Sequence, residues 1–258
     1  MQRPFSGKIL LIRRKYVVAF ALCIAVAAIF YVINHPALVG HTARERALPI
    51  YSVQRDDAVI SLTFNVRAAE DTYTGRVLQI LNTYDVRVTF FVTGEWVREN
   101  GPLAAEITAG GHELMNLSDD HSLLRRLSKQ EMAANILACS DTIELSTGTR
   151  PTAFRAPHGE YDDRVVAMAR SLGMYTVQWS IDSGDWRGLD AETIARQVQN
   201  RAFPGGIVLL HSNLSETAFA LPVIIEGLLQ EGYILVPVSE LLHNAEFTVS
   251  ITGKQVPV

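Results

Sequence analysis

The sequence is poor in cysteine. Only two of its 258 residues are cysteines. Cys23 falls in an apolar run near the N-terminus and Cys139 in a segment with helical periodicity, so the two thiols are not expected to meet. A disulfide framework is therefore excluded as a source of stability. The hydrophobic content of 48% instead predicts one large hydrophobic core.

Charge is absent from residues 16–33, which form a mostly apolar stretch of 18 residues. This length lies at the lower limit for a helix that crosses a bilayer. The stretch follows a basic segment that contains Arg3, Lys8, Arg13, Arg14 and Lys15. Such a segment predicts a cytoplasmic N-terminus at residues 1–15 and an exported remainder. We therefore expect an uncleaved transmembrane anchor in the cell membrane, followed by a stalk at residues 34–55.

A cleaved signal peptide is the alternative to an anchor. The small residues at positions 25–27 could form a cleavage site, but they lie in the middle of the apolar run. The apolar residues that follow them favour a single-pass anchor.

Acidic residues are absent from the first 34 positions. All 27 of them lie in the exported part, together with 18 of the 23 Lys and Arg residues, which gives this part a net charge of about −9. A basic patch for nucleic acid or anionic lipid is not expected there. The sequence therefore predicts no nucleic-acid partner.

Strand and helix patterns alternate along residues 56–243. The apolar runs typical of strands are 58–64, 87–93, 113–118, 152–155, 175–181, 206–211 and 233–237. The segments with helical spacing are 72–84, 102–109, 128–145, 164–172, 191–202 and 218–231. Ser128 and Glu131 match a capping box, and Asp190 is a predicted N-cap. The alternation predicts an α/β fold, a distorted (β/α) barrel of about seven parallel strands, with residues 244–258 as a C-terminal tail.

Polar side chains gather where the predicted strands end. In a barrel, function belongs to the C-terminal ends of the strands. The polar residues at these ends are Asn65, Asn116, Ser118, Arg155, Asp182, Asp185 and His211. We therefore expect a functional site at this face of the sheet.

His211 closes a buried strand and is a candidate general acid, because imidazole titrates near neutral pH. A structural histidine is the alternative. Either Asp182 or Asp185 could orient this imidazole, and Trp186 could wall an apolar subsite. Arg155 could fix a carboxylate or a sugar hydroxyl, although its segment also reads as a plain turn.

Together these segments resemble the polysaccharide deacetylases, the NodB-homology domain of carbohydrate esterase family 4. The resemblance covers residues 48–243, and the N-terminal part looks like the membrane-attached, spore-associated branch of Gram-positive bacteria. It implies a distorted (β/α) barrel that removes N-acetyl groups from chitin-like or peptidoglycan sugars. It also implies a divalent metal, commonly zinc, that activates water. In the family one aspartate is the base, and a second aspartate with two histidines holds the metal.

The first two motifs of this family are degenerate here. The motif Thr-Phe-Asp-Asp falls on residues 63–66, so that Asn65 occupies the base position and Val66 the position of the metal-binding aspartate. The second motif falls on residues 117–121, where Leu117 replaces the first metal histidine and His121 is the surviving one.

The later motifs are better kept. The third motif matches residues 155–159, with Arg155 in place, and the fourth matches Asp182, Asp185 and Trp186. The fifth matches Leu209 and His211. The resemblance thus assigns catalytic roles to Arg155 and the later acidic and histidine residues, and substrate contacts to Trp186, Leu209 and Asn65.

A catalytic zinc needs about three protein ligands. Valine and leucine offer no lone pair, and an asparagine amide cannot accept a proton at neutral pH. We therefore expect no bound cofactor; zinc or another divalent metal would be present only if the family mechanism persists. Asp119 or Asp120, beside His121, would be the substitute ligands in that case.

Three functions follow from these residues. The first is a family member that binds cell-wall glycan, peptidoglycan or chitin-like, and is inactive or weak as a metal-dependent deacetylase. The second is an active N-deacetylase that uses substitute ligands or a metal-free route through Asp182, Asp185 and His211. The third is a non-catalytic structural protein of the cell envelope.

Overall fold

The computed structural model of the protein describes residues 22–27, 30–31, 47–67 and 73–258. The chain divides into two units, Met1–Arg46 and Ala47–Val258. In the first unit, residues 22–27 and 30–31 are helical. The predicted cytoplasmic segment 1–15 and much of the predicted anchor 16–33 lie outside the described residues. In the part of the chain that the structure describes, no helix has the length and apolar character that a bilayer crossing requires. The anchor stays a prediction.

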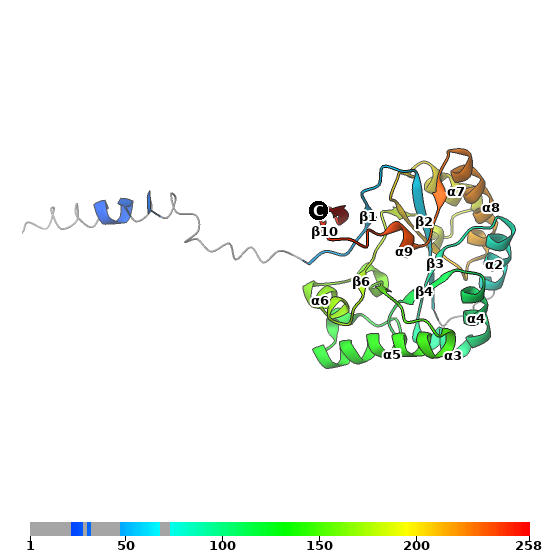
Figure 1. Cartoon of the computed structure of the whole chain (residues 1–258), viewed down its shortest axis with the longest axis horizontal. Helices are drawn as coiled ribbons and strands as arrows, with labels where there is room; N and C mark the ends of the chain where they lie inside the picture. Colours follow the sequence, from blue (N-terminus) through cyan, green and yellow to red (C-terminus); the bar gives the residue numbers. More distant parts are fainter. Residues whose placement is uncertain (1–21, 28–29, 32–46, 68–72) are drawn as a thin grey trace, which may run out of the picture. The chain divides into compact units, whose positions relative to one another are not determined.

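A parallel sheet forms the centre of the second unit (Figure 1). Its strands follow the order β6-β5-β4-β3-β2-β8-β7, and β9 pairs with β2 outside this path. The strands are β2 (Val59–Val66), β3 (Thr89–Val92), β4 (Glu113–Asn116), β5 (Ala153–Phe154), β6 (Tyr175–Thr176), β7 (Ile181–Asp182), β8 (Ile207–His211) and β9 (Ile234–Leu235). All these pairings are parallel. The predicted α/β sheet of about seven parallel strands is confirmed as a curled, open half-barrel.

One predicted strand is wrong. Residues 175–181 do not form one strand. Their first two residues form β6 and their last residue begins β7, and these two strands lie at opposite edges of the sheet. Between these edges, Val177 bridges to Ile50 and the Ser180 N–H donates to the Ile207 carbonyl at 3.0 Å. The chain therefore crosses the opening of the half-barrel here. An apolar run cannot reveal such a change of partner, because both halves need the same buried residues.

Helices lie around the strands, with α2, α4, α7 and α8 beside β2 and β3 (Figure 1). They are α2 (Thr74–Thr83), α3 (Gly94–Glu99), α4 (Gly101–Ala109), α5 (Lys129–Thr147), α6 (Asp163–Ser171), α7 (Ala191–Gln199), α8 (Ser215–Gln230) and α9 (Val238–Leu241). The predicted caps are confirmed: Ser128 and Glu131 form the capping box of α5, and Asp190 accepts from the Thr193 N–H at the start of α7.

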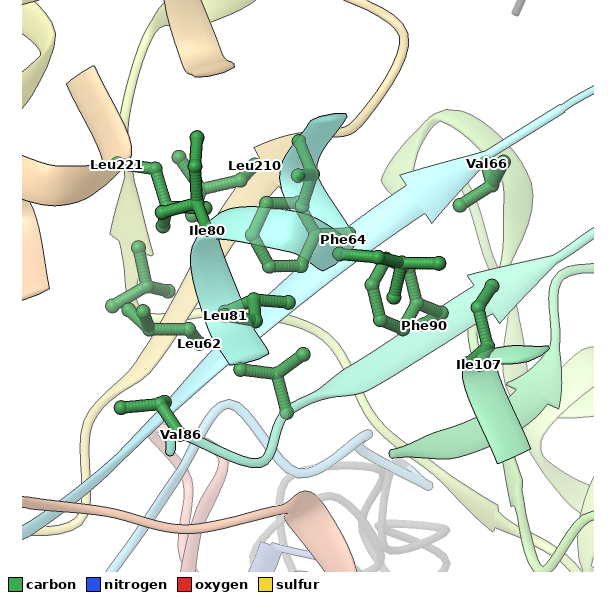
Figure 2. Close-up of a cluster of buried hydrophobic side chains, with 14 of the residues drawn as sticks. Leu62, Phe64, Val66, Ile80, Leu81, Val86, Phe90, Ile107, Leu210 and Leu221 are labelled. Atoms are coloured by element: carbon green, nitrogen blue, oxygen red, sulfur yellow. The ribbon is translucent and has the colours of Figure 1, made fainter. Parts of the chain in front are cut away.

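The two faces of β2 have different surroundings. Alternate side chains of a strand point to opposite faces. Ile60, Leu62, Phe64 and Val66 therefore share one face, and they pack with apolar residues of α2, α4 and α8 (Figure 2). The other face carries Asn65 at its end. Asn65 and Val66 thus point away from each other, although both belong to one motif.

The C-terminal segment is structured. Residues 244–258, expected as a tail, carry β10 (Phe247–Val249) and β11 (Lys254–Pro257), which pair antiparallel. β11 also pairs in parallel with β1 (Ser52–Val53), a strand from the predicted stalk. The buried Gln255 side chain accepts from the His243 N–H at 2.9 Å and donates to the His243 carbonyl at 3.1 Å. Short strands with a partner two hundred residues away give no local signal.

Candidate functional site

The C-terminal ends of the central strands bring the predicted site residues together. Asn65 is paired in register with His211 on the neighbouring strand, and Asp182 with Leu209. Arg155 follows β5, and Asp185 begins the short 3-10 turn η4 (Asp185–Arg187). Parallel strands present their C-terminal ends at one edge, so residues from distant parts of the sequence meet there.

The buried Asp185 and the partly exposed His211 form a hydrogen-bonded pair. Asp185 Oδ1 lies 2.8 Å from His211 Nδ1, and Asp185 Oδ2 accepts from the His211 backbone N–H at 2.7 Å. The Thr217 hydroxyl donates to the same Oδ2 at 2.8 Å. An ionised carboxylate only accepts hydrogen bonds, so Nδ1 carries its proton toward Asp185 and Nε2 is left for another partner. The geometry suits proton transfer at Nε2.

Asp182 has a different partner. It accepts from the Trp186 indole N–H at 3.2 Å and from the Gly184 backbone N–H at 2.8 Å. Of the two carboxylates that the sequence left open, Asp185 is therefore the one that orients His211. Trp186 is 55% exposed, and the Arg187 guanidinium lies 4.6 Å from its ring centroid. Asp182 thus holds an exposed indole in place.

Thr217 is a residue of this site that the sequence did not reveal. It lies in the first turn of α8 and is completely buried. A threonine in the first turn of a helix is common and has no signature of its own. Leu209, in contrast, lies where it was expected, buried on β8 and two residues before His211.

Arg155 is completely buried. Its guanidinium donates from Nη1 to Asn65 Oδ1 at 3.0 Å, from Nε to the Val177 carbonyl at 3.2 Å and from Nη2 to the Gln178 carbonyl at 3.1 Å. It lies 3.9 Å above the Phe91 ring centroid. Burial lowers the pKa of Arg155 well below its ordinary value. Arg155 therefore holds Asn65 directly, and its three hydrogen-bond acceptors are all neutral.

His121 lies in a loop, with a left-handed backbone at φ 60°. Its ring packs against that of His158 with centroids 4.3 Å apart. Burial lowers the pKa of His121 to about 4, and the positive charges of His158, Arg67 and His211 act in the same direction. The contact with His158 joins two loops and could not be read from the sequence.

The two possible substitute ligands are engaged elsewhere. Asp119 makes a bidentate ion pair with Arg98, with distances of 2.8 and 3.0 Å. Asp120 Oδ1 accepts from the Asn135 amide at 2.8 Å and from the Ser122 N–H at 3.1 Å. Both carboxylates therefore serve to order their own loop.

Comparison with known proteins decides the family. A family model for polysaccharide deacetylases matches residues 52–177. A peptidoglycan-N-acetylglucosamine deacetylase of Bacillus cereus is 34% identical over 198 residues, covering 75% of this chain and 92% of that protein. The chain belongs to the polysaccharide deacetylase family. The protein YlxY of Bacillus subtilis is 31% identical over 196 residues, which cover 76% of this chain and only 61% of YlxY.

Among solved structures, this family member resembles BA3943 of Bacillus anthracis, which is described as a pseudoenzyme of carbohydrate esterase family 4. The two chains are 32% identical with a TM-score of 0.73, and the match covers 81% of this chain and 71% of BA3943. A mutant of BA3943 is described as having restored enzymatic activity.

The metal on which deacetylases of this family generally depend does not fit the residues present. Val66 and Leu117, at the positions to which the motif resemblance assigns two of its ligands, have no lone pair and are completely buried in hydrophobic clusters. Figure 2 shows Val66 at the end of β2 in the cluster that contains Phe64 and Ile107. Within residues 22–27, 30–31, 47–67 and 73–258, no group of three or more His, Cys, Asp or Glu residues could hold a metal ion.

Proposed function

We propose that this chain is a membrane-anchored, extracytoplasmic polysaccharide deacetylase family member that binds cell-wall glycan without acting as a metal-dependent deacetylase. The observation that carries the proposal is the burial of Val66 and Leu117 at two metal-ligand positions. Side chains packed in the core cannot turn to an ion, and neither has a donor atom. The uncharged run at residues 16–33 supports the anchor.

Glycan binding is supported by the relatives and by one exposed side chain. The Bacillus cereus relative is named for action on peptidoglycan N-acetylglucosamine. Trp186 presents an indole that its hydrogen bond to Asp182 keeps in one orientation. A rigid aromatic ring offers a large apolar face at little entropic cost, and the C–H face of a sugar ring is suited to it.

The chain's own residues supply only part of a hydrolytic mechanism. His211, oriented by Asp185, can give a proton to a leaving group from Nε2. Asn65, at the position of the base, cannot take a proton from water at neutral pH. Asn65 therefore does not generate the nucleophile, and this favours binding over hydrolysis.

A second candidate is a weak deacetylase that uses a metal-free route. The intact pair of Asp185 and His211 favours it, because a histidine that a buried carboxylate orients can itself act as a base.

The test uses the full-length protein in detergent. We expect far less than one zinc ion per chain and no acetate released from chitin oligomers or peptidoglycan, together with cosedimentation with insoluble peptidoglycan. Trp186→Ala should lose the cosedimentation. Leu145→Ala is the control, because Leu145 is 90% exposed near the end of α5, before the start of β5 and thus away from the strand ends. Stoichiometric zinc with acetate turnover would sink the proposal, and acetate release without zinc would favour the metal-free route.

A further inference from the structure

Asn65 has a fixed orientation. A guanidinium group carries donors only, so the hydrogen bond from Arg155 Nη1 must go to the amide oxygen of Asn65. The amide nitrogen of Asn65, with two N–H groups, therefore points away from Arg155. Among the residues that the structure describes, none accepts a hydrogen bond from this nitrogen. Asn65 is half-buried at the end of β2, so this nitrogen stands at the site with free donors.

Arg155 is a buried cation without an anion. Its acceptors are two backbone carbonyls and the amide oxygen of Asn65, and no carboxylate of the described chain contacts it. A buried charge that lacks an opposite charge is costly, and an anion near it would relieve this cost. The hydrogen bond from the cation also polarises the Asn65 amide, which makes its N–H groups stronger donors. The positive charge of Arg155 thus strengthens hydrogen bonds that the Asn65 amide nitrogen donates at the site.

Other ionisable groups lie at the same strand ends. His211 is paired in register with Asn65. Arg67, His158 and His211 all lie within electrostatic reach of His121, as does Asp120, whose carboxylate accepts from the Asn135 amide. Asp182 and Asp185 lie at the same strand ends, but each has donors of its own: Trp186 donates to Asp182, and His211 and Thr217 donate to Asp185.

We infer that the strand-end site binds the carboxylate of an acidic sugar, which accepts hydrogen bonds from the Asn65 amide nitrogen, with Arg155 as the buried counter-charge. The inference rests on the proposed function, since it narrows the bound glycan to a carboxylate-bearing class. A neutral acetamide oxygen could accept the same hydrogen bond, but it brings no negative charge to Arg155. An aspartate at position 65 would accept hydrogen bonds and oppose a carboxylate. The asparagine amide nitrogen instead donates hydrogen bonds, and the uncharged side chain does not repel a carboxylate.

The direct test follows the side-chain amide of Asn65 by ¹⁵N NMR in the full-length protein, at constant ionic strength. Added D-glucuronate should shift this signal and saturate it, whereas N-acetylglucosamine should leave it in place. This measurement needs no variant, so it does not depend on the folding of a mutant. An unshifted Asn65 signal at saturating glucuronate would overturn the inference.

Variants then test the role of charge. Asn65→Asp places a carboxylate against Arg155 and should weaken glucuronate binding at least tenfold in calorimetry, and Asn65→Leu should do the same by removing the donors. Asn244→Asp makes the same change in an exposed loop and should bind like the wild type. Equal affinity of Asn65→Asp and wild type, both folded by circular dichroism, contradicts the inference.

The two proposals fail separately. If neutral chitin oligomers bind the wild type and glucuronate does not, the carboxylate assignment is wrong and the proposed glycan binding stands. If glucuronate binds but the wild type does not cosediment with peptidoglycan, the carboxylate site is supported and the proposed function loses its ligand.

Discussion

The strand-end site has two halves that differ in polarity: one contains a hydrogen-bonded carboxylate, and the other contains buried apolar side chains. In the half around Asp185, each oxygen of a buried carboxylate has hydrogen-bonded partners from the protein itself. In the half around Val66 and Leu117, the side chains have become part of the hydrophobic core. A polar group with protein partners is stable without a ligand, whereas a metal ligand without its metal is an unpaired buried group. Loss of the metal therefore predicts apolar replacement of metal ligands and retention of polar groups that have protein partners.

The most severe test of this contrast is a single change at Val66. Val66→Asp puts an unpaired carboxylate into the core and should lower the free energy of unfolding by about 3–5 kcal/mol, measured by urea denaturation. Val66→Thr, with a similar shape and no charge, should lose about 1–3 kcal/mol. A Val66→Asp protein as stable as the wild type would mean that the position is open to water.

A second test of the contrast introduces the base and metal-ligand residues of the family motifs together. The triple variant Asn65→Asp, Val66→Asp, Leu117→His adds two carboxylates and an imidazole, which with His121 complete the ligand set of the family motifs. We expect added zinc to raise its melting temperature and to leave that of Val66→Asp unchanged. If zinc has no effect on the triple variant, the strand ends have moved away from a metal-binding geometry.

A smaller effect is expected in the retained half. Asp185 accepts from three donors, and Asp185→Asn removes the charge and turns one acceptor oxygen into an N–H donor, which should cost about 1–3 kcal/mol of unfolding free energy. Thr217→Val removes one hydrogen bond and should cost about 1 kcal/mol. Equal losses in the two variants would show that Asp185 is not the centre of the network.

The smallest effect concerns pH. The pKa of His121 is lowered from 6.5 to about 4, so between these values the unfolded state holds the proton more readily than the folded state. The contribution of His121 to stability is therefore complete above about pH 6.5 and is lost as the pH falls toward 4. His121→Gln should make stability depend less on pH in this window. An NMR titration of His121 with a midpoint near 6.5 would contradict the expected burial.

The parallel sheet could be predicted because strand and helix periodicities alternate in residues 56–243 and because capping residues such as Ser128 and Asp190 mark helix starts. The crossing at residues 177–180 and the pairing of β1 with β11 could not, since each depends on a partner far away in the chain. Local patterns report burial and period. They do not report which strand is the neighbour.

For the site, the sequence placed the polar residues at the correct ends of the strands. It could not choose between Asp182 and Asp185, which are three residues apart and chemically identical. Only the fold shows that Asp185 lies under His211 and that Asp182 turns to Trp186. Likewise, the orientation of the Asn65 amide depends on Arg155, ninety residues away.

The buried side chains at 66 and 117 also bear on the history of the chain. A valine codon can become an aspartate codon, and a leucine codon a histidine codon, by a single base change. The genetic code therefore permits the motif's ligand residues at both positions by single base changes. Packing opposes it, because either change alone places an unpaired polar group in the core before a complete ligand set exists. Selection that tests one mutation at a time would act against these intermediates, so packing and not the genetic code opposes a metal ligand at either position.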